Sequence, residues 1–273
     1  MKIVRSPQEL KSILKDHTGT LGFVPTMGAL HSGHLSLIDA SVKNNEMTVV
    51  SIFVNPTQFL EGEDLDKYPK KFEADERICT FAGVDILFYP QVGDMYEADE
   101  IKIIAPNIRG YVLEGHVRPG HFDGVLTVVM KLLNIVRPTR AYFGKKDAQQ
   151  LALIMQMVKN YFMDVEIIPL NTVREPDGLA MSSRNVYLSP SEREEALKIS
   201  QSLKVATNLV IRKIFDVKAL KAEMKEVLRP LDVEYIAIVS RSFVPQDEVE
   251  IGNSIILVAV KLGSTRLIDN LWI

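Results

Sequence analysis

Short apolar runs alternate with amphipathic stretches over the first two thirds of the chain. The runs are too uniformly apolar for strands with one face in water, so we expect them to be covered on both faces. The predicted strands are 21–24, 48–54, 85–89, 140–143 and 165–169, and the predicted helices are 7–16, 33–44, 65–82, 124–136 and 147–162. Strands that alternate with helices in this way predict a parallel, doubly wound α/β sheet.

The rhythm changes after about residue 172. Two charged helical stretches, 190–212 and 217–228, follow one another, and three strand-like runs come after them at 233–239, 254–260 and 264–269. This order predicts a smaller α+β domain. A chain of 273 residues with 47% apolar side chains can bury a large core and favours two domains over one. We therefore expect domains at 1–172 and 173–273, with the boundary set by the change in pattern because no repeat or linker marks it.

Composition argues against several classes of protein. A net charge of −3 gives no basic footprint for DNA or RNA. No apolar stretch approaches the length of a membrane span, and the first residues lack the core of a signal peptide, so we expect a soluble protein with no membrane partner. The single cysteine, Cys79, cannot form an internal disulfide, which favours a reducing cytoplasm. We expect its side chain on the buried side of a helix.

The segment 22–34 joins a predicted strand to a predicted helix through a turn that carries two histidines. His31 and His34 are three residues apart, so both rings lie on one helix face, at the end where unpaired N–H groups and the macrodipole attract anions. Gly28 and Gly33 let the backbone turn sharply or approach a ligand closely. The pattern predicts a site for a nucleotide phosphate. The alternative is a helix start with a capping histidine and two turn glycines, which the strand before it and the periodic apolar residues after it make less favoured.

Four further polar stretches follow apolar runs or precede helices, where sheets of this kind bind ligands. Segment 51–59 supplies two amides, Asn55 and Gln58, for the oxygens of a small polar ligand, or it is only an Asn-Pro turn. Segment 142–150 offers lysine to phosphates and aspartate to a ribose, or it is a solvated helix start. Segment 172–185 can close over a polyphosphate with Arg184, or it is an interdomain turn with a surface arginine. Segment 118–124 is an anion-binding lip, or a turn with a helix cap.

Five motifs in this order resemble the pantothenate synthetase family, the pantoate–β-alanine ligases. They are Pro-Thr-Met-Gly-Ala-Leu-His-x-Gly-His at 25–34, Phe-Val-Asn-Pro-Thr-Gln-Phe at 53–59, Arg-Pro-Gly-His-Phe at 118–122, Phe-Gly-x-Lys-Asp-x-Gln-Gln at 143–150 and Met-Ser-Ser-Arg-Asn at 181–185. The His-x-Gly-His element is also similar to the signature of a wider superfamily of nucleotidylyltransferases and class I aminoacyl-tRNA synthetases. The other four motifs are much narrower.

The resemblance implies ATP-dependent condensation of pantoate with β-alanine through a pantoyl-adenylate, with release of pyrophosphate and then AMP. It also implies a Rossmann-like first domain that binds ATP and pantoate, a second domain that acts as a lid, and a cytoplasmic homodimer. Mg²⁺ would be carried mainly on phosphate oxygens, with Asp75 as a candidate outer contact. The apolar residues Ile101, Ile103 and Ile104, near an irregular stretch, could belong to the dimer surface.

The resemblance assigns roles to individual residues. His31 and His34 contact phosphates, with His34 the donor during adenylyl transfer, while Lys146 neutralises phosphate charge and Arg184 faces the phosphates. The expected ATP-binding residues are Met27, Gly28, Ala29, Leu30, His31, Ser32, Gly33, His34, Gly144, Lys145, Lys146, Asp147, Val173, Met181, Ser182, Ser183 and Arg184. The expected pantoate-binding residues are Pro25, Thr26, Met27, Asn55, Gln58 and Gln150. Lys145 and Ala148 stand where the family often has an acidic and an aromatic residue, a departure that bears on local packing more than on chemistry.

Two other functions stay open at this point. One is another nucleotidylyltransferase or acid-activating enzyme of the same superfamily. The other is a nucleotide-sensing module that binds ATP without turnover. A sensor has no need of a second polar pocket, so the paired amides Gln58 and Gln150 favour an enzyme.

Overall fold

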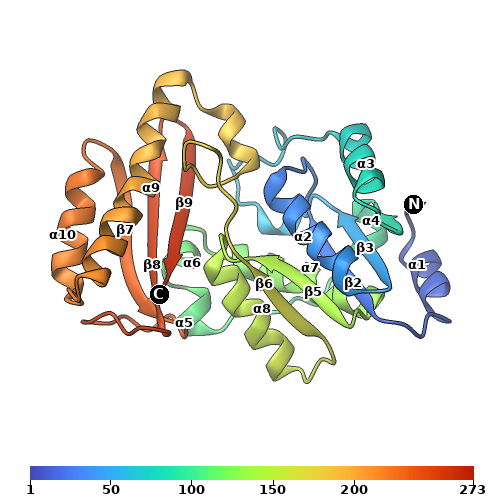
Figure 1. The fold of residues 1–273 in the computed structure, drawn as a ribbon. Helices are drawn as coiled ribbons and strands as arrows, with labels where there is room; N and C mark the ends of the chain where they lie inside the picture. Colours follow the sequence, from blue (N-terminus) through green and yellow to red (C-terminus); the bar gives the residue numbers. More distant parts are fainter. The chain divides into compact units, whose positions relative to one another are not determined.

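A computed structural model describes all 273 residues, which form two compact units. The first unit contains Met1–Lys145 and Gln149–Asn171, and the second contains Lys146–Ala148 and Thr172–Ile273 (Figure 1). The second unit takes over the chain at Thr172, where the sequence pattern changes, and it also includes three residues from the middle of the chain. None of the helices combines the length and the apolar content that crossing a bilayer requires.

A parallel sheet of six strands is the centre of the first unit. The strands are β1 (Lys2–Val4), β2 (Leu21–Thr26), β3 (Met47–Ile52), β4 (Ile86–Phe88), β5 (Arg140–Gly144) and β6 (Glu166–Leu170). Their order in the sheet is β1-β4-β3-β2-β5-β6, and every pair is parallel. The predicted doubly wound α/β sheet is confirmed.

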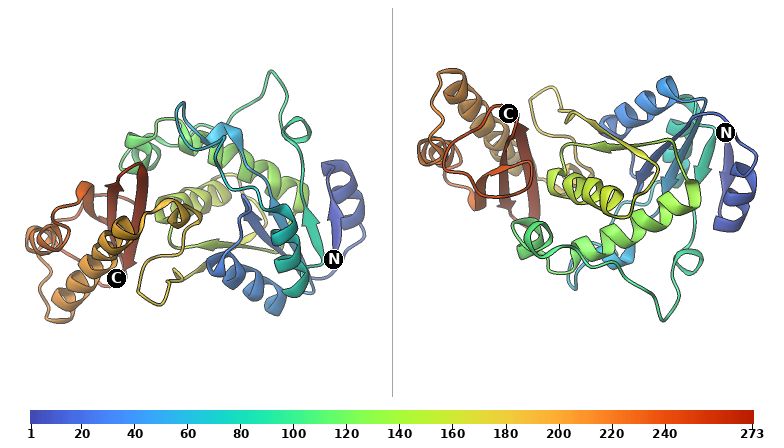
Figure 2. Two further views of the ribbon diagram at one scale, coloured as in Figure 1. Left: turned by 90° about the horizontal axis from the view of Figure 1, so that it is seen from above. Right: turned by 90° about the horizontal axis from the view of Figure 1, so that it is seen from below.

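Helices cover both faces of this sheet. The longer ones are α1 (Pro7–Leu14), α2 (Ser32–Asn44), α3 (Phe72–Phe81), α7 (His121–Val136) and α8 (Ala148–Asn160). Short turns of helix lie between them: η1 (Pro56–Gln58), α4 (Val92–Met95), α5 (Asn107–Gly110) and α6 (Glu114–Val117). Figure 2 shows α2 and α7 on opposite faces of the sheet. Leu37 and Ile38 of α2 and Cys79 of α3 pack against Val24 and Val50 of the sheet. Cys79 is fully buried, as expected, and burial raises the pKa of its thiol to about 12.

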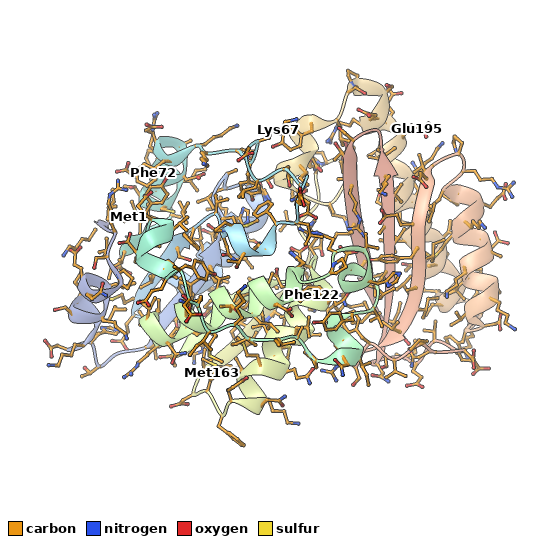
Figure 3. All side chains as sticks on the ribbon, turned by 180° about the vertical axis from the view of Figure 1, so that it is seen from behind. Met1, Lys67, Phe72, Phe122, Met163 and Glu195 are labelled. Carbon is orange, nitrogen blue, oxygen red and sulfur yellow. The ribbon has the colours of Figure 1, made fainter.

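One predicted helix begins much later in the structure, and one strand of the sheet was not predicted. The helix expected over 65–82 begins only at Phe72, because residues 65–68 form turns and a bend and Pro69 follows them in an irregular segment. In Figure 3, Lys67 lies in this irregular segment and Phe72 in the first turn of α3. A proline in a helix interior removes a backbone donor and clashes with the preceding turn, so this boundary has a physical cause. Strand β1 was not predicted, because three residues are too few to show a period; it pairs with β4 at the edge of the sheet.

The second unit has two helices and an antiparallel sheet. Helices α9 (Pro190–Ile211) and α10 (Val217–Val227) pack against strands β7 (Asp232–Ser240), β8 (Ser254–Leu262) and β9 (Thr265–Trp272), whose order is β7-β8-β9. A short turn of helix, η2 (Ser183–Tyr187), precedes α9. The predicted α+β character is therefore confirmed. Leu203, Leu220, Ile238 and Val258 lie in its apolar core.

The strand order determines which loops meet. Strands β3, β2 and β5 are neighbours at the middle of the first unit's sheet, and all three run in the same direction. Their carboxyl ends carry the turn after Thr26, the amide segment after Ile52 and the glycine Gly144. Ligands of open parallel sheets bind at this edge, and the motifs 25–34 and 53–59 and the start of the motif 143–150 meet there.

Candidate active site

The turn after β2 is held by its own polar groups. The hydroxyl of Thr26 donates to the carbonyl oxygen of Ser51 at 2.8 Å and accepts the backbone N–H of Gly28 at 3.2 Å. Gly28 has a φ of 86° and Ala29 a φ of 51°, so two successive residues adopt the left-handed region. Alanine is uncommon in that region, because its Cβ crowds the backbone. Contacts from elsewhere in the fold must therefore hold the turn in this conformation.

A buried carboxylate supplies those contacts. Asp75 of α3 is only 2% exposed, and its two oxygens accept the backbone N–H groups of Ala29 and Leu30, each at 2.8 Å. Burial raises the pKa of Asp75, while the two N–H groups act in the opposite direction because they stabilise the charged form. Asp75 therefore clamps the turn that precedes α2. This function was not visible in the sequence, where Asp75 was only a candidate contact for Mg²⁺.

The two histidines form the start of α2. His31 is the N-cap; its Nδ1 accepts the N–H of Gly33 at 3.1 Å, and the Nδ1 of His34 accepts the N–H of His31 at 3.4 Å. The ring centroids are 4.1 Å apart. A neutral imidazole whose Nδ1 accepts a hydrogen bond carries its proton on Nε2. Both rings therefore cap the helix through Nδ1, as the capping alternative proposed. The same hydrogen bonds leave the proton of each neutral ring on Nε2, and an Nε2–H group is a donor that can bind a phosphate oxygen.

Replacing Asp75 with asparagine tests the clamp. We expect the free energy of unfolding of the variant to be about 2 kcal/mol lower than that of the wild type. The reason is that the amide nitrogen of asparagine would face one of the two backbone N–H groups and leave it unpaired. Urea unfolding of Asp75→Asn measures this, with the exposed Glu73→Gln on the same helix as the control. An unchanged unfolding free energy, accompanied by a tenfold weaker dependence of activity on Mg²⁺, would instead identify Asp75 as a metal contact.

The amides Asn55 and Gln58 lie together beside Met27. Asn55 is 1% exposed: its Oδ1 accepts the hydroxyls of Tyr96 at 2.8 Å and Thr57 at 3.0 Å. Its Nδ2 donates to Oε1 of Gln58 at 3.0 Å and to the carbonyl oxygen of Gly124. Gln58 Nε2 then points to the sulfur of Met27, at 3.1 Å. Asn55 therefore orients the side chain of Gln58 through its Oε1, and Gln58, rather than Asn55, directs its amide at Met27.

Close backbone packing supports this arrangement. A Cβ added at Gly124 of α7 would collide with the carbonyl oxygen of Thr57 and with the backbone of Gln58. Only glycine lets α7 approach η1 so closely. The sequence placed Gly124 at the end of the segment 118–124 and at the start of a predicted helix, 124–136. In the structure α7 begins earlier, at His121, so Gly124 lies in its first turn, packed against the segment that carries Gln58.

Gln149, which follows β5, has a structural role that the sequence did not suggest. Gln149, 3% exposed, donates to the carbonyl oxygens of Arg109 and Val112 and accepts the N–H of Glu114, so it holds α5 and α6. The predicted pantoate-binding residue Gln150 is its neighbour on α8 and is half-buried. Lys145 also has a contact inside the first unit, since its Nζ donates to Asn171 at 2.9 Å.

The remaining predicted residues belong to the second unit. Lys146 is half-buried; its Nζ lies 3.4 Å from Oδ1 of Asp147, and its carbonyl oxygen accepts the amide of Asn270 at 2.6 Å. The loop that contains Val173, Met181 and Ser182 is braced in the same unit. Its internal hydrogen bonds are Met181 N to Val173 O at 3.0 Å and Arg184 N to Ser182 Oγ at 3.3 Å.

Ion pairs hold this loop in place. Arg174 makes a bidentate pair with Asp269 at 2.6 and 3.0 Å, and Arg193 contacts Glu175 and Asp177. Asn185 donates to Glu175 at 2.7 Å. The segment that carries Ser182, Ser183 and Arg184 is therefore an ordered part of the second unit. The structure places the predicted residues in two sets, one in each unit.

Together these features define an α/β nucleotide-binding enzyme: a parallel sheet with a histidine-capped helix after its second strand and a hydrogen-bonded pair of amides after the next strand. The chain belongs to the pantoate–β-alanine ligase family, whose model matches residues 2–272. Two pantothenate synthetases cover all of the chain and are covered by it, at 63% identity from Sulfurimonas denitrificans and 45% from Helicobacter pylori. The resemblance seen in the motifs is confirmed.

Solved structures agree over the whole length. Pantothenate synthetase from Thermus thermophilus matches with a TM-score of 0.95 at 41% identity, covering 99% of both chains. Pantoate–β-alanine ligase from Francisella tularensis, complexed with β-γ ATP and β-alanine, matches with a TM-score of 0.83 at 37% identity, covering 100% of this chain and 97% of the other.

Proposed function

We propose that the chain catalyses the ATP-dependent condensation of pantoate with β-alanine to pantothenate, through an enzyme-bound pantoyl-adenylate. Family membership over nearly the whole chain supports this proposal, as does the relative solved with β-γ ATP and β-alanine. The observation that carries it is local: the imidazoles of His31 and His34 lie at the start of α2, a few residues after Met27, and the half-buried amide of Gln58 is directed at Met27. Donors for a phosphate and for a small polar acid are thus adjacent in one unit.

The two-step course follows from the chemistry of a carboxylate. Its oxygen is a poor leaving group, so an amine does not displace it. In the first step a carboxylate oxygen of pantoate bonds to the α-phosphorus of ATP, and pyrophosphate leaves. In the second step the amine of β-alanine bonds to the activated carbonyl carbon, loses a proton, and AMP leaves. A site that holds the reactants in register and excludes water protects the intermediate from hydrolysis.

We assign the residues of the two units to these steps. His34, supported by His31, donates to phosphate oxygens as charge develops on them, and the turn 27–34 with Gly144 lies against ATP. Lys146 and Arg184 neutralise phosphate charge, Asp147 contacts the ribose, and Val173 and 181–183 complete the nucleotide site. Gln58 and Gln150 bind the oxygens of pantoate, with Pro25, Thr26, Met27 and Asn55 around it.

Mg²⁺ belongs to the proposal as a partner of ATP. The structure has no group of three or more His, Cys, Asp or Glu side chains that could hold a metal ion, and Asp75 uses both oxygens for backbone N–H groups. We therefore assign the binding of Mg²⁺ chiefly to the phosphates of ATP, the arrangement that this ion usually adopts. Such an ion supplies charge neutralisation on the polyphosphate when it is bound.

An assay with single omissions tests the function. We expect purified protein given ATP, Mg²⁺, pantoate and β-alanine to form AMP, and omission of pantoate or β-alanine to abolish steady turnover. Pyrophosphate release with pantoate but without β-alanine, limited to about one per site, is expected from a bound adenylate. AMP formation only with another acid would indicate a different acid-activating enzyme, and ATP binding without turnover would indicate a sensor.

We further propose that the chain forms a homodimer in the cytoplasm. The single buried cysteine is compatible with a reducing compartment. Ile101 and Ile104, 89% and 72% exposed, are apolar side chains that a second copy would cover. We expect sedimentation velocity to show a dimer for the wild type and a monomer for the double variant Ile101→Asp, Ile104→Asp. Ile211→Asp, also at a 72% exposed isoleucine, should stay dimeric. A wild-type monomer would contradict the proposal.

A further inference from the structure

Two side chains of the segment 118–122 hold the main chain of Gln58. Nδ1 of His121 lies 2.7 Å from the carbonyl oxygen of Gln58, and Nη2 of Arg118 lies 3.3 Å from the same oxygen. Nη1 of Arg118 lies 3.1 Å from Nε2 of His121. Arg118 also forms a bidentate pair with Glu63, with both N–O distances at 2.6 Å.

These partners determine the state of the His121 ring. A carbonyl oxygen can only accept, so Nδ1 carries the proton and donates it to Gln58. A guanidinium can only donate, so Nε2 accepts from Arg118. The ring is therefore neutral and in one tautomer. Burial of the residue, which is 8% exposed, and the charge of Arg118 lower the pKa of His121 to about 4, in agreement with this assignment.

The guanidinium of Arg118 has little capacity for a ligand. Four of its five N–H donors bind Glu63, Gln58 and His121. Glu63 stays ionised: burial acts to raise its pKa, but the hydrogen bonds from Arg118 and from the N–H of Leu60 hold that pKa below its usual value. Of the two interpretations of this segment, an anion-binding lip and a turn, the geometry favours the turn, with Arg118 serving other residues of the protein.

We infer that Arg118 and His121 are positioning residues for the acid-binding site, acting through Gln58. They fix the main chain of Gln58, while Asn55 fixes its amide so that Nε2 is the end directed at Met27. The inference rests on the proposed function, in which Gln58 binds pantoate. With both ends of Gln58 held, its donor is oriented before the substrate arrives, and less conformational freedom is lost on binding. Glu63 completes the arrangement, because it ties the segment that leaves Gln58 to the same guanidinium.

Kinetics of His121 variants test the inference. We expect His121→Leu to raise the KM for pantoate ten- to a hundredfold, the scale of a misplaced binding group, with the KM for ATP changed less than twofold. His121→Asn should recover most of the affinity, because its Nδ2 can take the place of Nδ1 as the donor to Gln58. Arg118→Lys, which keeps the charge but loses the planar fork, should fall between them. His116→Leu, at an exposed histidine of α6, is the control.

A double-mutant cycle with Gln58→Ala separates positioning from a general loss of structure. If His121 acts through Gln58, His121→Leu should raise the KM for pantoate little further in the Gln58→Ala background. Equal increases in both backgrounds, or an equal increase in the KM for ATP, would overturn the inference while leaving the proposed function intact. A Gln58→Ala variant with an unchanged KM for pantoate would instead refute the acid site, and the inference with it. Thermal unfolding of each variant identifies any that fails to fold, and His121→Asn then carries the cycle.

Discussion

Replacing His34 with alanine is expected to slow pantoyl-adenylate formation by about a hundredfold or more while ATP binding is largely kept. This is the usual scale for the loss of one donor that acts on charge developing in a transition state. The structure gives the physical reason. Because Nδ1 of His34 accepts the N–H of His31, the neutral ring carries its proton on Nε2, the end that can donate to a phosphate oxygen. Rapid-quench measurement of pyrophosphate release in a single turnover is the direct assay.

Two further variants separate this role from helix capping. Asparagine places an acceptor near the position of Nδ1 but has no group at Nε2, so His34→Asn keeps the cap and should be as slow as His34→Ala. Glutamine reaches the Nε2 position with an amide donor, so His34→Gln should recover part of the rate. If His34→Asn were fully active, the ring would serve only as a cap. An almost unchanged burst of pyrophosphate in His34→Ala would refute the catalytic role.

The features that could be predicted from the sequence were those with a local cause. Strands β2 to β6 are apolar over nearly their whole length, and the spacing of His31 and His34 puts both rings at one helix end. Each of these follows from residues within a few positions of one another. The prediction of a helix over 65–82 was wrong about where the helix begins, because it extended the apolar periodicity through Pro69, where helix formation is unfavourable.

The features that could not be predicted depend on contacts between distant segments. Asp75 clamps a turn about 45 residues before it, Tyr96 reaches Asn55 across 41 residues, and Arg118 meets Glu63 across 55. Nothing local marks these partners, so Asn55 was expected to line the substrate pocket, and Asp75 to touch a metal. The structure shows that Asn55 donates to the amide of Gln58 and that Asp75 holds the backbone of Ala29 and Leu30, contacts that neither expectation included. Much of the support for the proposed site is therefore made of tertiary contacts that a single sequence does not reveal.

Lys146 offers the second large effect. We expect Lys146→Ala to slow adenylation by about a hundredfold or more, comparable with His34→Ala, because an ammonium that neutralises the departing pyrophosphate acts mainly as that charge develops. The amide of Asn270 binds the main-chain carbonyl of Lys146, and the ammonium of Lys146 lies beside Asp147, so the position of the side chain is constrained at both ends. Single-turnover adenylation and ATP binding are measured separately, since only the first reports on the transition state.

Lys145 supplies the matched control, because it is the same residue type one position earlier. Lys145 was expected among the ATP-binding residues, but its ammonium binds Asn171. Any contact of Lys145 with ATP would therefore come from its main chain, and Lys145→Ala should change the adenylation rate less than a few fold. A weaker ATP affinity in Lys146→Ala with a preserved single-turnover rate would make Lys146 a docking group, since uniform binding is lost without any change in the barrier from the bound state. A loss of rate at saturating ATP, absent in Lys145→Ala, would assign the effect to the charge at position 146 rather than to the positive charge of the segment as a whole.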